Sequence, residues 1–373
     1  MRDLIVFGED YGALPSSTQH LIKRLASKRK VLWVNSIGLR QPRLTTNDMR
    51  RALGKVLGKS KASHFQTTRI ERPASMTIAN IHTLPAPRAT WSRKLAAKAM
   101  AHQLKPMIDR LQLNDPIVWT SLPTASDVCA LLGQRSVVYY CGDDFGALAG
   151  VDHETVLDHE KGLVEQADLV ITASEKLCSK FPSHKTRLLS HGVDSEQFSK
   201  PAKRALDLPN RGRPIAGFYG SLSNWLDYEL LNQTIAALPN WDFVFIGQIE
   251  LNSLPIIAAN NVFYLGSKPH HELPGYSQHW TVSLLPFVLN EQIKACNPLK
   301  LKEYLAARTP IVSTDFPALT GYREHVNVVS NVEGMVVTLN RIACENQTLP
   351  KGLVDSDSWD NRASTLESYL EAL

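Results

Sequence analysis

The sequence predicts an α/β protein with two doubly wound, Rossmann-like domains, and three observations lead to this prediction. The chain has 373 residues, about two to three times the usual domain size. Apolar residues make up 43% of it and charged residues 21%, which is typical of a globular protein with substantial cores. Short β-branched runs alternate with helical patterns throughout, as in parallel sheets covered by helices.

In the first half, the alternation is clearest around buried-type runs such as residues 4–7 and 137–141. We expect strands near 4–7, 31–34, 78–84, 117–120, 136–141, 168–172 and 186–190, and helices near 17–27, 92–112, 124–132 and 153–166. The second half repeats the pattern, with strands near 215–219, 242–246, 262–265, 281–285 and 310–313, and helices near 226–238, 251–259, 298–308 and 333–345.

Residues 199–214 contain prolines and basic residues with little periodicity, which is typical of a linker. The expected organisation is therefore an N-terminal domain over 1–198, a linker over 199–214, a C-terminal domain over 215–355, and a final helix over 356–373 that packs back toward the N-terminal domain. Ligands of such domains bind at the carboxyl ends of the strands.

The charge is unevenly distributed. Residues 1–190 carry a net charge of +10 and residues 191–373 a net charge of −5, and residues 40–110 alone carry +12. The basic half is expected to meet an anionic partner, such as a membrane surface or a charged glycan. Nucleic acid is disfavoured because the basic stretch has almost no aromatic residues on which bases stack.

The absence of several sequence motifs indicates the cellular compartment and disfavours some cofactor classes. No run approaches the ~20 apolar residues of a membrane span, the first residues turn acidic too early for a signal peptide, and the five cysteines form no paired motif. Gly58-Lys59-Ser60 and the glycines after residue 141 do not have phosphate-loop or dinucleotide spacing. We expect a cytoplasmic protein, peripheral to the inner face of a plasma membrane, that is not a nicotinamide dehydrogenase.

The segment from Asn297 to Pro310 carries the most chemical information. Asn297 is a good helix N-cap and Pro298 a good first residue, so a helix is expected to start there. Lys300 then lies in the first turn, where free amides and the helix dipole favour an anion. Glu303 follows on the same face, so a diphosphate on Lys300 with ribose hydroxyls on Glu303 suits a sugar nucleotide. The alternative is a surface Lys–Glu pair.

This segment resembles the Pro-x-Lys-x-x-Glu-Tyr-Leu-Ala helix of GT-B glycosyltransferases, particularly bacterial polysaccharide enzymes of the teichuronic-acid type and, more distantly, of the xanthan type. The resemblance runs nearly from end to end. It includes Gln19-His20-Leu21, residues 137–144, residues 167–174, His191-Gly192-Val193-Asp194, residues 217–221, Gly266 and Ser358-Trp359-Asp360. It implies the GT-B fold, with two domains facing across a cleft that holds the active site.

The resemblance also implies site residues. Asp143, after a predicted buried strand, is the expected general base, with Asp144 beside it; the alternative is that both cap the following turn. Donor-binding residues are expected to be Gly220, Ser221, Asn297, Lys300, Glu303, His191, Ser267 and His270. A tight turn that uses Gly192 alone is the alternative for His191. The loop containing Gly8, Gly12, Ser16 and His20 is expected near the donor or acceptor, or else is a plain strand-to-helix turn.

The chain departs from the wider retaining family at three positions. Ala295 stands where many members have a first glutamate, Ser221–Asp227 replaces the usual basic pair, and Arg308 stands where glycine is usual. Lys300 is then the main phosphate cation, and no metal or other cofactor is expected to be required.

The basic region contains an amphipathic pattern with an apolar stripe between lysines and arginines. We expect it to contact anionic lipid through Arg50, Arg51, Leu53, Lys55, Val56, Leu57 and Lys59. A second such pattern, over 91–110, is more readily interpreted as a helix packed on its own domain.

The sequence therefore predicts a glycosyltransferase that moves a sugar from a nucleotide-diphosphate donor to a lipid-linked or polysaccharide acceptor in bacterial surface or exopolysaccharide synthesis. The alternatives are an inactive scaffold that binds sugar nucleotides, or a sugar-nucleotide epimerase on the same fold.

Overall fold

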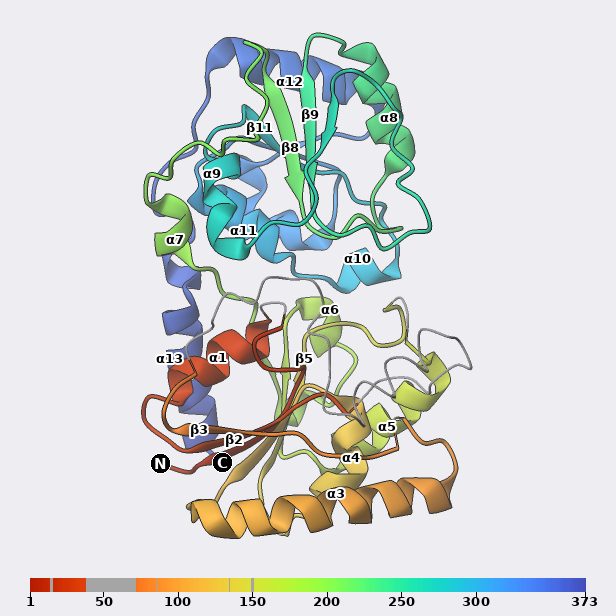
Figure 1. The fold of residues 1–373 in the computed structure, drawn as a ribbon, viewed down its shortest axis with the longest axis vertical. Coiled ribbons are helices and arrows are strands. Elements are labelled where there is room, and N and C mark those ends of the chain that lie inside the picture. Colours follow the sequence, from red (N-terminus) through yellow and green to blue (C-terminus); the bar gives the residue numbers. More distant parts are fainter. Residues whose placement is uncertain (14–15, 38–71, 85, 134, 149–150) are drawn as a thin grey trace. The chain divides into compact units, whose positions relative to one another are not determined.

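A computed structural model describes residues 1–13, 16–37, 72–84, 86–133, 135–148 and 151–373. The chain divides into two compact units (Figure 1). The first contains Met1–Ser190 and Arg362–Leu373, and the second contains His191–Asn361. Residues 199–214, expected as a linker, thus belong to the second unit. The expected membrane-contact residues between Arg50 and Lys59 lie outside the described residues.

The described part of the first unit holds a seven-stranded, all-parallel sheet in the order β3-β2-β1-β4-β5-β6-β7. Its strands are short and mostly buried on both faces, which explains their continuous apolar sequences. They are β1 (Leu4–Phe7), β2 (Val31–Val34), β3 (Met76–Ala79), β4 (Ile117–Thr120), β5 (Val137–Cys141), β6 (Leu169–Thr172) and β7 (Thr186–Leu188).

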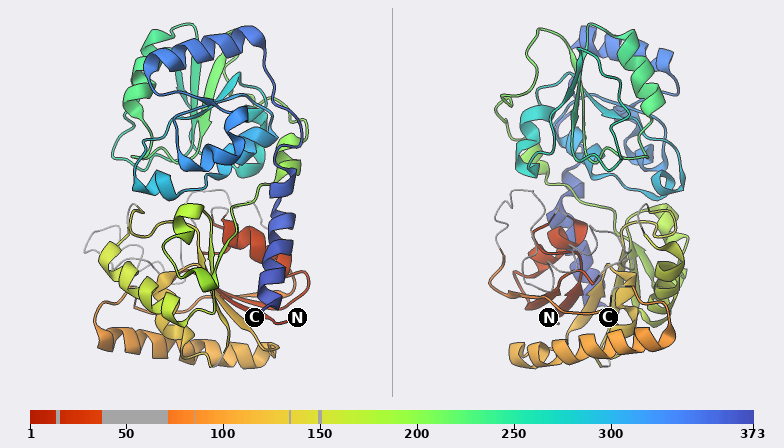
Figure 2. Two further views of the ribbon diagram at one scale, coloured as in Figure 1. Left: turned by 180° about the vertical axis from the view of Figure 1, so that it is seen from behind. Right: turned by 45° about the vertical axis from the view of Figure 1, so that its right-hand side comes forward.

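Helices lie on both sides of this sheet (Figure 2). They are α1 (Ser17–Leu25), α3 (Thr90–Leu111), α4 (Ser126–Cys129), α5 (His153–Gln166) and α6 (Glu175–Cys178), with the last part of α13 (Trp359–Glu371). Glu367 of α13 pairs with Lys28 (2.8 Å) and Arg29 (3.2 Å), just after α1.

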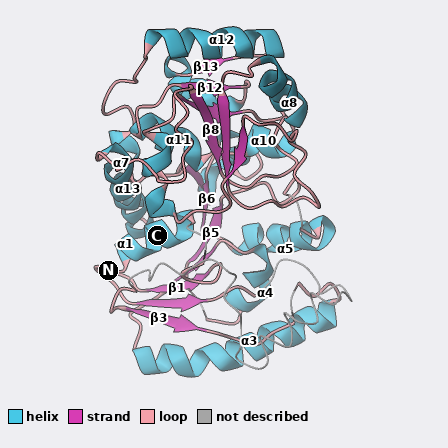
Figure 3. Cartoon of the chain, turned by 45° about the horizontal axis from the view of Figure 1, so that its top comes forward, coloured by secondary structure: helices cyan, strands magenta, loops and turns pink. Residues whose placement is uncertain are grey.

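The second unit holds a six-stranded parallel sheet in the order β10-β9-β8-β11-β12-β13 (Figure 3). Its strands are β8 (Ile215–Tyr219), β9 (Asp242–Ile246), β10 (Val262–Tyr264), β11 (Val282–Leu285), β12 (Ile311–Ser313) and β13 (Asn327–Val328). Its helices are α7 (Ser195–Ser199), α8 (Tyr228–Ala237), α9 (Pro274–Ser277), α10 (Glu291–Ala295), α11 (Leu299–Ala306) and α12 (Val332–Glu345). The predicted α/β class with two parallel sheets is confirmed.

One predicted helix is wrong. Residues 251–259 form bends and irregular backbone, because Pro255 interrupts any helical hydrogen bonding and the Asn232 side chain of α8 takes over the free backbone groups. Its Nδ2 donates to the Pro255 carbonyl, and its Oδ1 accepts from the Ile257 amide, both at 2.9 Å. The two-residue strand β13 has no counterpart in the prediction, because two residues show no periodicity.

The predicted start of the helix after Asn297, observed as α11, also needs correction. Pro298, with extended backbone (φ −72°, ψ 121°), occupies the N-cap position of α11, and no side chain caps the helix. Asn297 therefore lies one residue before the cap, so its predicted capping role is wrong. Lys300 still falls in the first helical turn, as predicted.

Within the described residues, no helix has both the length and the apolar run that crossing a bilayer requires.

Candidate functional site

The candidate donor site lies at the carboxyl ends of the second unit's strands, where α11 begins. Gly220 directly follows β8 and has φ +136°, a conformation that side chains rarely adopt. A Cβ at Gly220 would lie 2.6 Å from Cε of Lys300, and a Cβ at Gly247, after β9, would lie 1.9 Å from the Gly220 carbonyl oxygen. The two glycines thus let the strand ends and the Lys300 side chain approach one another closely.

The Lys300 ammonium lies between aromatic rings rather than beside an acid. Its Nζ is 5.6 Å from the ring centroids of both Phe218 and Phe287. Among the described residues it has no hydrogen-bond or ion-pair partner. Burial lowers the pKa of Lys300 and outweighs the opposing attraction of Glu303. A desolvated cation without a close counter-ion is suited to receiving an anion.

Glu303, one turn further along α11, is buried and bound by a residue that the sheet brings to it. Nε2 of His270 lies 2.7 Å from Oε1 of Glu303. His270 belongs to a short 3₁₀ segment after β10, 33 positions earlier in the chain. The structure thus brings together Gly220, Lys300, Glu303 and His270, four of the predicted donor-binding residues.

Helix α11 is fixed to the sheet through its tyrosine. The Tyr219 backbone amide donates to the Tyr304 hydroxyl at 3.1 Å, and the two rings meet edge to face. The Tyr219 hydroxyl is buried without a hydrogen bond in the described residues, and burial together with Glu303 raises its pKa.

The His191 segment is bound to α11 through a buried lysine that the sequence analysis missed. Lys302 donates to the His191 carbonyl oxygen and pairs with Asp357 at 3.1 Å. Gly192 is needed for close approach, because a Cβ there would lie 2.6 Å from the Trp359 ring. Asp357 supplies the counter-ion of the buried Lys302 ammonium, and no spacing rule links positions 302 and 357.

The remaining predicted donor residues in this unit have less defined roles. Ser221 follows Gly220, and its hydroxyl has no hydrogen bond among the described residues. Ser267 is exposed just after Gly266, whose carbonyl accepts from the Gly247 amide at 2.9 Å. Asn297 precedes α11 and is partly exposed.

In the first unit, the two aspartates after β5 differ in their contacts. Asp144 accepts from Lys180 at 2.6 Å and from the Gly146 amide at 3.0 Å, so it has the turn-capping role considered as the alternative. Asp143 is solvent-exposed, and its carboxylate has no hydrogen bond among the described residues. Partial loss of water around it, together with the charge of Asp144, raises the pKa of Asp143.

In the described part of the loop after β1, several polar groups bond to one another, while the Tyr11 hydroxyl is buried without a hydrogen bond among the described residues. Ser16 caps α1, since its Oγ accepts from the Gln19 amide at 3.2 Å, and it also donates to Glu9. Gly12 has φ +83°, and its amide donates to Oε1 of Gln19 at 3.1 Å. Gly8 is required by packing, because a Cβ there would lie 2.8 Å from the Trp33 ring. His20 lies in the first turns of α1 and is partly exposed.

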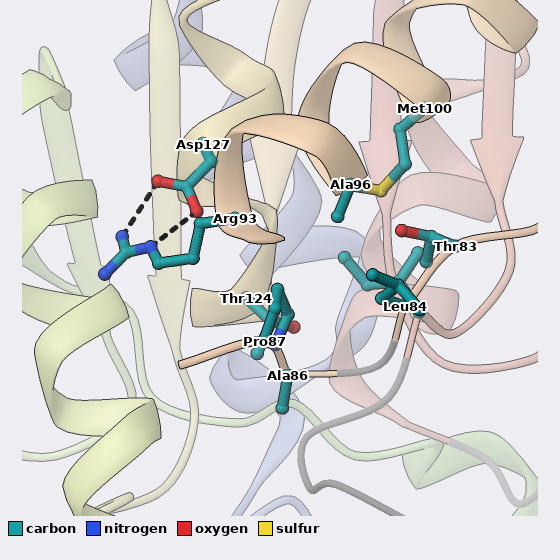
Figure 4. A pocket seen from close by; sticks show the side chains of 10 residues that line it. Thr83, Leu84, Ala86, Pro87, Arg93, Ala96, Met100, Thr124 and Asp127 are labelled. Carbon is teal, nitrogen blue, oxygen red and sulfur yellow. Dashed lines mark hydrogen bonds and ion pairs between the residues drawn. The ribbon is translucent and has the colours of Figure 1, made fainter. Parts of the chain in front are cut away.

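Two cavities lie away from these residues. One in the first unit, beside the Arg93–Asp127 pair (2.8 Å), measures about 10 Å³, enough for about one water molecule (Figure 4). Another, of about 590 Å³, lies at the amino ends of β11 and β12, lined by Trp280, Arg308 and Thr309 among others. It is therefore at the opposite edge of the sheet from Gly220. The described residues hold no cluster of three or more His, Cys, Asp or Glu side chains arranged for a metal ion.

Comparisons with known proteins agree with this architecture. No protein-family model matches the chain. Over 258 residues, 62% of the chain, it is 25% identical to a candidate teichuronic acid biosynthesis glycosyltransferase of Bacillus subtilis (strain 168), and the match spans 65% of that protein, just under two thirds of its length.

Solved structures match over the whole chain. Sucrose-phosphate synthase from Thermosynechococcus elongatus has a TM-score of 0.69 at 17% identity, with 100% of this chain and 99% of that chain covered. HepE of Anabaena, solved with UDP and glucose, has a TM-score of 0.65 at 12% identity, with 100% of both chains covered. The fold is the GT-B glycosyltransferase fold. The predicted resemblance, to GT-B enzymes and to the teichuronic-acid type, is confirmed.

Proposed function

We propose that this chain is a glycosyltransferase that moves a sugar from a nucleotide-diphosphate donor to a lipid-linked or polysaccharide acceptor in bacterial surface or exopolysaccharide synthesis. The observation that carries the proposal is the partly buried Lys300 ammonium, which has no counter-ion among the described residues and lies beside Gly220 in the first turn of α11. The name of the B. subtilis relative supports the polysaccharide class, and the UDP bound to HepE supports the donor class.

In this proposal the donor's diphosphate meets Lys300, the Ser221 amide and the N-terminal end of α11. These groups stabilise the charge that develops as the diphosphate departs. Gly220, whose own amide donates to the Ile246 carbonyl oxygen at 2.9 Å, leaves room for the Lys300 side chain beside it. Because Lys300 supplies the neutralising charge, no metal ion is required. Glu303 accepts hydrogen bonds from the ribose, and Asn297, His191, Ser267 and His270 complete the surroundings of the donor.

Asp143 is the general base in this scheme. It takes the proton of the acceptor hydroxyl as that oxygen attacks the anomeric carbon and the bond to the diphosphate breaks. The free carboxylate of Asp143 suits this role better than that of Asp144, which is bound to Lys180. Gly8, Gly12, Ser16 and His20 are proposed to lie near the donor or acceptor.

We further propose that the protein works at the inner face of the plasma membrane. One face of α3 is buried through Met100 and Leu104, while Trp91 and Leu95 are exposed at 71% and 56%. Lysines at 94, 98 and 105 are also exposed. An exposed tryptophan among lysines suits an anionic lipid surface, which the expected contacts between Arg50 and Lys59 would extend.

The test is release of nucleoside diphosphate from a panel of uridine, guanosine and thymidine diphosphate sugars with membrane extract as the acceptor source. The proposal expects turnover with one donor, and donor binding by the purified protein. A folded protein that binds none of these donors would overturn it.

A binding scaffold without turnover is the second candidate, because Ala295 is buried in α10 at the position where many relatives have a glutamate. Saturable donor binding with no transfer to any acceptor, unchanged in Asp143→Asn, would favour it. An epimerase would convert the donor without an acceptor.

A further inference from the structure

His270 is bonded at both ring nitrogens and packed on a third side. Its Nε2 lies 2.7 Å from Oε1 of Glu303, and its Nδ1 lies 3.2 Å from the Gln197 side-chain amide. That amide also donates to the His270 carbonyl oxygen at 3.1 Å, and Phe198 meets the imidazole edge to face at 5.3 Å. The ring therefore has one orientation, fixed by α7 on one side and α11 on the other.

Glu303 gains a fixed orientation from this contact. Its side chain is only 9% exposed, and it lies one helical turn after Lys300. A carboxylate that receives one hydrogen bond at Oε1 can still accept from other donors at both oxygens. A ribose offers two adjacent hydroxyls, and a pair of hydroxyls binds a carboxylate well only when the carboxylate plane is fixed.

The charged groups around His270 give this contact a dependence on pH. Glu303 acts on it from α11 and Asp194 from the start of α7, and Glu303 also interacts electrostatically with Tyr219 and Lys300. Burial lowers the pKa of His270, but the hydrogen bond and charge of Glu303, together with Asp194, outweigh it and leave the pKa above its ordinary value. Neutral His270 already donates from Nε2 to Glu303 and accepts at Nδ1 from Gln197. Protonation adds a positive charge that strengthens the bond to Glu303 and replaces the hydrogen bond from Gln197. This charge is lost as the pH rises through the raised pKa.

We propose that His270 is a positioning residue that holds Glu303 for the ribose of the donor, and that its protonation makes nucleoside diphosphate binding depend on pH. This inference rests on the proposed function, since it assumes a nucleoside diphosphate against Lys300. It adds a positioning role for His270 and a pH response of that site.

The experiment measures calorimetric Kd values for uridine diphosphate and for its 2′,3′-dideoxy analogue across pH 5.5–8.5. The variants are His270→Phe, which removes the bond to Glu303, and His270→Gln, which keeps a neutral donor. His271→Asn is the matched control, because His271 is the exposed neighbour and does not contact Glu303. Circular dichroism and thermal unfolding establish that each variant is folded.

The wild type is expected to prefer the ribose form by about tenfold or more, the effect of a charge-assisted hydrogen bond. His270→Phe is expected to lose most of this preference, His270→Gln to recover part of it, and His271→Asn to retain it. The affinity ratio between wild type and His270→Gln is expected to fall as pH rises, and the nucleotide's own ionisation cancels in that ratio.

Each other result has a separate meaning. A wild-type ribose preference that is unchanged in His270→Phe, or an affinity ratio that is independent of pH, overturns the inference and leaves the proposed function standing. A wild-type protein that binds uridine diphosphate and its 2′,3′-dideoxy analogue equally well also overturns the inference and leaves the proposed function standing. A wild type that binds no nucleoside diphosphate at any pH overturns the proposed function itself.

Discussion

The loops after β1 and β8 occupy equivalent places in their sheets and differ in what they leave available. Each follows a strand that lies between two neighbours, β2 and β4 for β1, β9 and β11 for β8. After β1, Glu9 accepts from Ser16 and Gln19, and Gln19 accepts from the Gly12 amide. These three side chains of the loop and of α1 therefore bond to one another or to the loop backbone.

After β8, the corresponding groups have no such partners. Within the described residues, neither the Ser221 hydroxyl nor the Lys300 ammonium forms a hydrogen bond, and Gly220 leaves room for Lys300 beside the backbone. The same strand order thus supports a closed loop in one unit and an open, cationic one in the other. The sheet topology determines that ligands bind at the carboxyl ends of the strands, and the side chains there determine whether an anion can bind.

The largest expected effect separates chemistry from binding. Asp143→Asn removes the proposed base, so turnover is expected to fall by about 10²–10⁴-fold with nucleoside diphosphate affinity unchanged. Because the pKa of Asp143 is raised, wild-type turnover is expected to fall as the pH drops through that raised value and protonates the carboxylate. Steady-state rates and calorimetry measure both quantities.

Asp144→Asn is the control for that variant, since Asp144 is bound to Lys180 and Gly146. Asp144→Asn is expected to reduce the free energy of unfolding while leaving the turnover rate close to that of the wild type. Equal rates for Asp143→Asn and wild type would remove Asp143 from the mechanism.

Lys300→Met tests the open loop directly. Losing one charge-assisted contact is expected to weaken nucleoside diphosphate binding by about 10–100-fold. Thermal stability should hold or rise, because the variant no longer buries an unpaired charge. Lys294→Met, in the neighbouring α10 and paired with Glu291 at 2.7 Å, is the control and should bind normally. An affinity unaltered by Lys300→Met would contradict the assignment.

A matched pair of glycine variants sharpens the contrast between the loops. Gly220→Ala and Gly8→Ala are each expected to lower the free energy of unfolding by about 1–3 kcal/mol, the first through backbone strain and the second through overpacking on Trp33. Only Gly220→Ala should also weaken nucleoside diphosphate binding, because its methyl group displaces Lys300. Denaturant unfolding and calorimetry on both variants check this, and equal binding losses would erase the contrast.

The smallest effect is expected in the closed loop. Ser16→Ala removes the α1 N-cap and should cost about 1 kcal/mol of stability. Donor affinity should stay at the wild-type value, as measured by unfolding and calorimetry on the same preparation. A clear loss of donor affinity would show that the Ser16 hydroxyl serves the ligand despite its bond to Glu9.

Much of the fold could be predicted because buried parallel strands have continuous apolar runs, and most predicted strands lie within one or two residues of the observed ones. The expected strand over 78–84 is Met76–Ala79; Ile81 and Leu84 are interspersed with polar residues beyond Ala79, the last residue paired with β2. The positions of Lys300 and Glu303 followed from helical spacing, whereas the cap failed because Pro298 rather than Asn297 takes the extended position.

The contacts within the site could not be predicted in the same way. Glu303 meets His270, and Lys302 meets Asp357, only after the sheet has formed. Such pairings depend on tertiary packing between distant segments, and no local pattern in a single sequence encodes them. Sequence reasoning therefore singled out Lys300, Glu303 and His270, which the structure brings together, but not the bonds they form.

The Lys302 ammonium connects α11, which carries the proposed nucleotide-binding residues, to the backbone at the start of the second unit. Lys302 donates to the carbonyl oxygen of His191, the first residue of the second unit. It belongs to α11, the helix that also carries Lys300 and Glu303. A nucleotide that reduces the motion of α11 would then also reduce the motion of residues 191–193. Amide exchange at residues 192–193 should then slow when the protein is saturated with nucleoside diphosphate, giving a reporter of binding next to the proposed donor residue His191.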